Sequence, residues 1–120
     1  MAILQKKTKK AVLHATANTT WVIAGNSSVS NVANVDEHVY SGAIRQIWFG
    51  SPSGNSSYWT VKRGANVVMV VDSTGWIDFS GHGQAITQDA SANVVVELTA
   101  AGDGSGYIMI EVSKNSNTGF

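Results

Sequence analysis

Two stretches of the sequence carry residue types that could perform hydrolysis. Peptide cleavage by paired carboxylates needs two aspartates that share one proton, each on a short Asp-Thr-Gly or Asp-Ser-Gly loop. In the stretch 72–75 (DSTG) an extra residue separates Asp72 from Gly75, and the chain has no second copy of the motif. We therefore interpret 72–75 as a β-turn, in which Asp accepts backbone hydrogen bonds and Gly eases the exit.

The second stretch, 78–83 (DFSGHG), places Asp78, Ser80 and His82 within five residues. A catalytic triad needs the three side chains to converge, with the base hydrogen-bonded to the nucleophile. His82 lies between two glycines in a predicted turn, and no Gly-x-Ser-x-Gly motif accompanies it. The chain also has no cysteine and three scattered histidines. We therefore expect no enzymatic activity, no metal site and no cofactor.

The remaining sequence has the character of short β-strands. Runs rich in Val, Ile, Thr, Tyr and Trp alternate with clusters of Gly, Asn and Ser, and no stretch keeps a helical period over a dozen residues. With 120 residues the chain is expected to form one domain. The predicted class is all-β, as an antiparallel β-sandwich of which the jelly roll is one form, and a small closed barrel is the alternative.

Three of the predicted strands are well defined by their patterns. Residues 107–112 and 93–99 alternate apolar and polar, and Asp103-Gly104 between them predicts a C-terminal hairpin. Residues 66–71 are apolar on both faces, which predicts a central strand covered on both sides.

The basic residues are unevenly distributed. Four of the eight lie in the first ten positions, whereas the remaining 110 residues carry four basic residues against all eight acidic ones. This division predicts three segments: an extended basic N-terminal arm (1–10), a single β-sandwich domain (11–112) and a loose C-terminal tail (113–120).

Three roles are open for the arm: a solvated terminus, nucleic-acid attachment, or docking on a protein. Specific nucleic-acid binding is not expected, because the body carries no basic patch of its own. No apolar run is long enough to cross a membrane. The favoured role is docking on an acidic, partly apolar neighbour, because apolar residues flank the lysines. The predicted docking residues are Ile3, Leu4, Lys6, Lys7, Lys9 and Lys10.

The aromatic residues suggest a second surface. Tyr58 and Trp59 follow the loop 51–57, and in a regular strand one of the two faces outward. They are therefore candidates for a ligand or subunit contact, while packing in the core is the alternative for the tryptophans.

The stretches MAILQKKTKKAVLHATANTTWVIAGN, SGAIRQIWFGS, DSTGWIDFSG and GSGYIMIEVSK resemble small virion structural proteins of tailed bacteriophages, especially marine phages of cyanobacteria. The resemblance implies a capsid decoration (cement) protein, made in the host cytoplasm and located in the virion. It also implies the major capsid protein or another virion protein as partner, and many copies. We expect a homo-oligomer, with a trimer as one candidate. A glycan-binding or receptor-adhesion module of a virion or cell surface is the alternative function.

Overall fold

The computed structural model describes residues 2–6, 10–50, 57–72, 74–79, 91–99 and 106–118, and within these ranges all the regular secondary structure is β-strand. The strands are β1 (Ala2–Lys6), β2 (Lys10–Ala15), β3 (Thr19–Trp21), β4 (Glu37–Gly50), β5 (Tyr58–Arg63), β6 (Asn66–Asp72), β7 (Thr74–Asp78), β8 (Val94–Thr99) and β9 (Tyr107–Thr118). The all-β class predicted from the sequence is confirmed.

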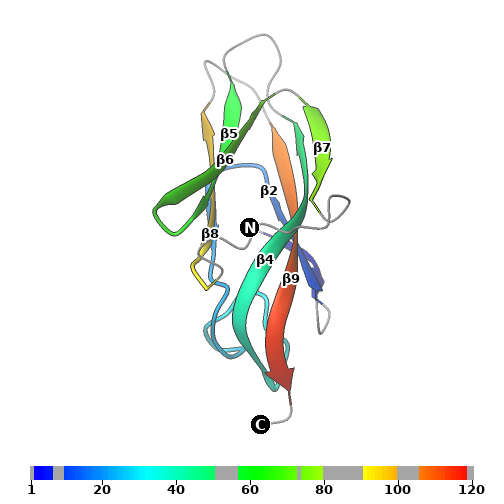
Figure 1. Ribbon diagram of the computed structural model, residues 1–120, viewed down its shortest axis with the longest axis vertical. Helices are drawn as coiled ribbons and strands as arrows, with labels where there is room; N and C mark the ends of the chain where they lie inside the picture. Colours follow the sequence, from blue (N-terminus) through cyan, green and yellow to red (C-terminus); the bar gives the residue numbers. More distant parts are fainter. Residues whose placement is uncertain are drawn as a thin grey trace.

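The strands form two antiparallel sheets that pack face to face (Figure 1). One has the order β1-β2-β9-β4-β7 and the other β3-β8-β5-β6. Strands β2 to β5 pair in reverse order with β9 to β6: β2 with β9, β3 with β8, β4 with β7 and β5 with β6. One long antiparallel hairpin wrapped into two sheets is the strand order of a jelly roll. The sandwich is therefore confirmed, in its jelly-roll form.

Alternation of side chains places the core between the sheets. Along β2 and β5 every second residue is buried. Leu13, Ile47 and Ile110, neighbours in register on β2, β4 and β9, are completely buried, as are Trp59 and Val61 of the facing sheet. The fold is thus held mainly by apolar area removed from water between two patterned faces.

Two hydrogen bonds also cross from one sheet to the other. The Trp59 indole Nε1 of β5 donates to the Gly50 carbonyl of β4 over 3.1 Å. Arg63, also on β5 and completely buried, donates from its guanidinium to the Gly42 carbonyl over 2.6 Å and to the Ala92 carbonyl over 2.9 Å. Strand β4 is therefore attached to β5 near its middle and at its end.

The described parts of both predicted terminal segments belong to the five-stranded sheet, which corrects the boundaries expected at residues 10 and 112. Residues 2–6 pair as β1 with β2, and Ile3 packs against the core. Residues 113–118 continue β9 and pair with β4 as far as the register Glu37–Thr118. The sequence suggested a loose tail because the inward positions hold the polar residues Lys114 and Ser116. In the structure the polar groups of both side chains have a buried partner, Glu37.

The predicted C-terminal hairpin was wrong, because β8 and β9 lie in different sheets. The turn signal at 103–104 falls outside the described residues.

The prediction of a central strand at 66–71 was also wrong: β6 is the edge of its sheet. The stretch 72–75 does not join two strands of one sheet, because β6 and β7 lie in different sheets. The apolar residues on both faces of β6 therefore belong to an edge strand and not to a central strand covered on both sides.

Two glycines of β4, Gly42 and Gly50, allow a test of how closely the strand packs against its neighbours. A Cβ at Gly42 would lie 2.6 Å from Val112 Cγ1 and 3.1 Å from Ile23 Cγ2, both in the packed core. A Cβ at Gly50 would instead meet the ring of Tyr107, 2.5 Å from Cε1, and that side chain is partly exposed. We expect Gly42→Ala to lower the free energy of unfolding by about 1–3 kcal/mol, because a packed core resists added volume.

The matched variant Gly50→Ala should cost about 1 kcal/mol or less, because the Tyr107 ring can rotate into solvent. Urea unfolding of both variants beside the wild type measures the difference. Equal losses in the two variants would contradict the packing described for Gly42.

Candidate functional site

A tight turn before β4 directs a glutamate into the interior. The Glu37 amide donates to the Asn34 carbonyl over 3.0 Å, and the Asn34 amide donates back to Glu37 Oε1 over 2.8 Å. Asp36 within this turn has a φ of 64°, a left-handed conformation that Asp tolerates. The reciprocal pair of hydrogen bonds fixes the direction in which the Glu37 side chain points.

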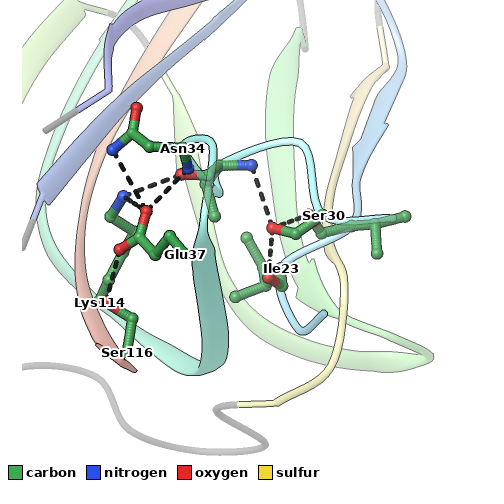
Figure 2. A network of polar contacts seen from close by, with 8 residues as sticks. Ile23, Ser30, Asn34, Glu37, Lys114 and Ser116 are labelled. Carbon is green, nitrogen blue, oxygen red and sulfur yellow. Dashed lines mark hydrogen bonds and ion pairs between the residues drawn. The ribbon is translucent and has the colours of Figure 1, made fainter. Parts of the chain in front are cut away.

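The Glu37 carboxylate lies in a buried polar network, the Glu37–Lys114 network, made by Asn34, Glu37, Lys114 and Ser116 (Figure 2). Lys114 Nζ of β9 is 2.8 Å from Glu37 Oε1 and donates to the Val32 carbonyl over 2.9 Å. The Ser116 hydroxyl donates to Glu37 Oε2 over 2.5 Å. The side chains of both Glu37 and Lys114 are completely inaccessible to solvent.

Hydrogen bonds keep this carboxylate ionised despite its burial. Burial by itself raises the pKa of Glu37, but the Asn34 amide, Lys114 and Ser116 donate to the carboxylate, and the Lys114 charge attracts it. The balance lowers the pKa of Glu37 below its ordinary value of 4.5. Because both partners are enclosed, the network holds structural elements together.

Further polar contacts attach the connection 22–36 to the body. Gly25 and Val39 exchange two backbone hydrogen bonds of 2.8 and 2.9 Å. The buried Ser30 hydroxyl donates to the Ile23 carbonyl over 2.6 Å and accepts from the Val32 amide over 3.1 Å (Figure 2). The long connection between β3 and β4 is therefore fixed in place, so that the Val32 carbonyl meets Lys114.

The solvent-facing side of the five-stranded sheet carries an aromatic surface. Trp48 of β4 and Trp76 of β7 are opposite each other in register, with ring centroids 6.5 Å apart and planes 11° from parallel. Met109 and His14 continue the same row across β9 and β2. Trp76 is 57% exposed, although tryptophan is usually well buried.

A chain of polar contacts runs beside the two rings. Trp76 Nε1 donates to Gln46 Oε1 over 2.9 Å, and Gln46 Nε2 donates to Glu111 Oε2 over 2.6 Å. Lys10 Nζ lies 3.8 Å from Glu111 Oε1. We call Gln46, Trp48, Trp76, Met109 and Glu111 the outer tryptophan face.

The other sheet exposes aliphatic side chains on its edge strand, β6. Val67 and Val70 are 54% and 56% exposed. In register they lie beside Lys62 and Thr60, so they share the outer face although they are three residues apart. A bulge at Val68, between the partners of Val61 and Lys62, produces this alignment. We call Val67 and Val70, with the backbone of β6, the valine edge.

The described residues among those predicted as site residues lie in different parts of the structure. Ile3 packs against the core, Leu4 and Lys6 are residues of β1, and Lys10 begins β2, while Lys7 and Lys9 fall outside the described ranges. Trp59 is completely buried, which corrects its prediction as a contact residue, whereas Tyr58 is partly exposed on the outer side of β5.

The described residues contain no cluster of three metal-ligating side chains. No helix in the same part of the chain is long and apolar enough to cross a membrane. Comparisons with protein-family models, curated proteins and solved structures found no match for this chain.

The Glu37–Lys114 pair can be tested by a double-mutant cycle. Glu37→Gln or Lys114→Met alone should lower the free energy of unfolding by about 3–5 kcal/mol, because each leaves one buried charge without its partner. The double variant should be clearly more stable than the sum of the single losses predicts. Urea unfolding gives all four values, and additive losses would contradict a direct interaction.

The same pair predicts a pH dependence of stability. Because the folded-state pKa of Glu37 is below 4.5, the folded protein binds its proton less readily than the unfolded chain. The resulting stability is complete above pH 4.5 and is lost as the pH falls through the lowered folded-state pKa. The difference in urea midpoint between wild type and Glu37→Gln should be constant near neutrality and shrink on acidification. A difference that grows in acid would contradict the direction of the pKa shift.

Proposed function

We propose that the protein is a non-enzymatic structural protein of a phage virion, specifically a capsid decoration protein that binds the major capsid protein lattice in many copies. The resemblance of its sequence to small virion structural proteins suggests the particle. The jelly roll is compatible with this role, since it is common in viral capsid domains and also in lectins. Fold alone does not assign a function, so the proposal depends on a surface.

The valine edge is the observation that carries the proposal. An edge strand presents unpaired backbone groups that can pair with another chain, and soluble monomers usually protect such edges with charged side chains. The one charged residue of β6 is Asp72 at its end, and two of its valines are more than half exposed. Exposed apolar side chains on an edge strand suit a protein neighbour, to which β6 would add as a strand.

The basic N-terminal residues are part of the same proposal, but β1 is paired in the sheet instead of forming the extended arm that the sequence predicted. Because β1 pairs with β2, Lys6 belongs to the edge strand of the five-stranded sheet and Lys10 to its neighbour β2. Docking of the predicted lysines on an acidic neighbour remains a proposal. Lys6 and Lys10 would take part in it from paired strands rather than from a free arm.

The proposal is tested by binding to particles. Purified chain is mixed with capsids of the same phage that lack it, the capsids are sedimented, and bound chain is quantified. Val70→Lys should reduce binding about tenfold or more, because a charge would be buried without a partner at the contact. The matched control is Val35→Lys, at a valine that is 81% exposed and outside the valine edge.

Val35→Lys should bind like the wild type, and both variants should keep the wild-type unfolding midpoint. Mass spectrometry of purified virions should detect the chain in many copies. Virions without the chain would refute the virion assignment. Full capsid binding by Val70→Lys would refute the valine edge as the contact.

A further inference from the structure

We propose that the outer tryptophan face binds a neutral oligosaccharide, with a pyranose ring stacked on Trp76 and its hydroxyl groups bonded to Gln46 and Glu111. The sequence suggested glycan binding at Tyr58 and Trp59, but Trp59 is completely buried. The aromatic surface that solvent reaches lies on the other sheet. This inference is independent of the valine edge and of capsid binding.

The aromatic part of the face is already positioned for a flat ligand. The planes of Trp48 and Trp76 are within 11° of parallel, and Trp76 is 57% exposed, so a sugar ring can reach Trp76 beside its partner ring. The hydrogen bond from Trp76 Nε1 to Gln46 Oε1 fixes the exposed ring on the sheet. A ring held in place before binding loses little conformational entropy when the ligand arrives.

The polar part of the face offers unused hydrogen-bonding capacity. Gln46 uses one lone pair of its oxygen for Trp76 and one hydrogen of its amide nitrogen for Glu111. An amide has two of each, and a carboxylate accepts up to about four hydrogen bonds. Sugar hydroxyls both donate and accept, so they can complete the bonding of Gln46 and Glu111 without displacing the existing contacts.

Charge favours a neutral ligand over an anionic one. The row beside the rings contains the carboxylates of Glu111 and Asp78, and Lys10 lies close to Glu111. Arg45 adds a second positive charge nearby, since its Nε donates to Ser113 Oγ over 3.2 Å. The charges therefore balance, and no surplus of positive charge attracts phosphate or an acidic sugar. A protein partner fits less well, because the centres of protein interfaces are depleted of charged groups. The combination of near-parallel rings with a polar, charge-balanced border therefore favours a neutral glycan.

Calorimetric titration of the full chain tests the proposal. The neutral probes are cellohexaose, laminarihexaose and chitohexaose, and the acidic probes are alginate oligosaccharide and heparin. We expect at least one neutral probe to bind with a Kd of about 1 mM or tighter, as the small contact area allows. Trp76→Ala should weaken this binding about tenfold or more, and Gln46→Leu should weaken it too, because it removes both the polar groups offered to the sugar and the hydrogen bond that positions Trp76.

The matched control is Tyr40→Ala, at an aromatic residue of β4 that is 47% exposed and eight positions from Trp48. It should bind the same probe like the wild type, as should Val70→Lys, and all variants should keep the wild-type unfolding midpoint. Neutral binding that survives Trp76→Ala overturns the site. Failure of every neutral probe, binding of the acidic probes alone, or self-association abolished by Trp76→Ala overturns the ligand class.

Discussion

One buried ammonium group joins three parts of this jelly roll. Lys114 Nζ contacts the Glu37 carboxylate at the start of β4 and the Val32 carbonyl of the connection 22–36, and Lys114 itself belongs to β9. Removing two charges from water is costly, and the cost is offset here by close geometry and by the hydrogen bonds from Asn34 and Ser116. A pair of this kind specifies arrangement more than it adds stability, because any other register would leave a buried charge without its partner.

Contacts along the whole of β4 fix its pairing with β9, which shifts register twice, between Val39 and Ser41 and between Ile44 and Gln46. Its residues pair with β9 over the length of the strand, its Gly42 carbonyl accepts from Arg63, and its Gly50 carbonyl accepts from Trp59. Inward positions on β4 are therefore fixed by packing and by hydrogen bonds from the opposite sheet. A register shift between Ile44 and Gln46 changes the alternation, so Gln46 and Trp48 face outward on either side of the buried Ile47.

The sequence predicted the sandwich because apolar residues at every second position are visible in 94–98 and 108–112. It did not predict the extension of β9, although the same spacing continues through Lys114 and Ser116, because polar residues at inward positions look like a loop until their partner Glu37 is known. Pairing order was also hidden: the turn signal at 103–104 suggested a local hairpin, whereas each strand found partners far along the chain. Trp59 shows the same limit, since alternation predicted that one of Tyr58 and Trp59 faces outward but not which of the two.

The side chains of the two exposed surfaces lie on the outer faces of different sheets, and this follows from the sandwich itself. The valine edge belongs to the four-stranded sheet and the outer tryptophan face to the five-stranded sheet, whose inner faces are both used by the core (Figure 1). A neighbour that extended the sheet at β6 would therefore leave Trp48 and Trp76 facing solvent. Attachment to a particle and recognition of a glycan would then be compatible in one copy, and many copies on one lattice would convert a weak contact per site into strong overall attachment.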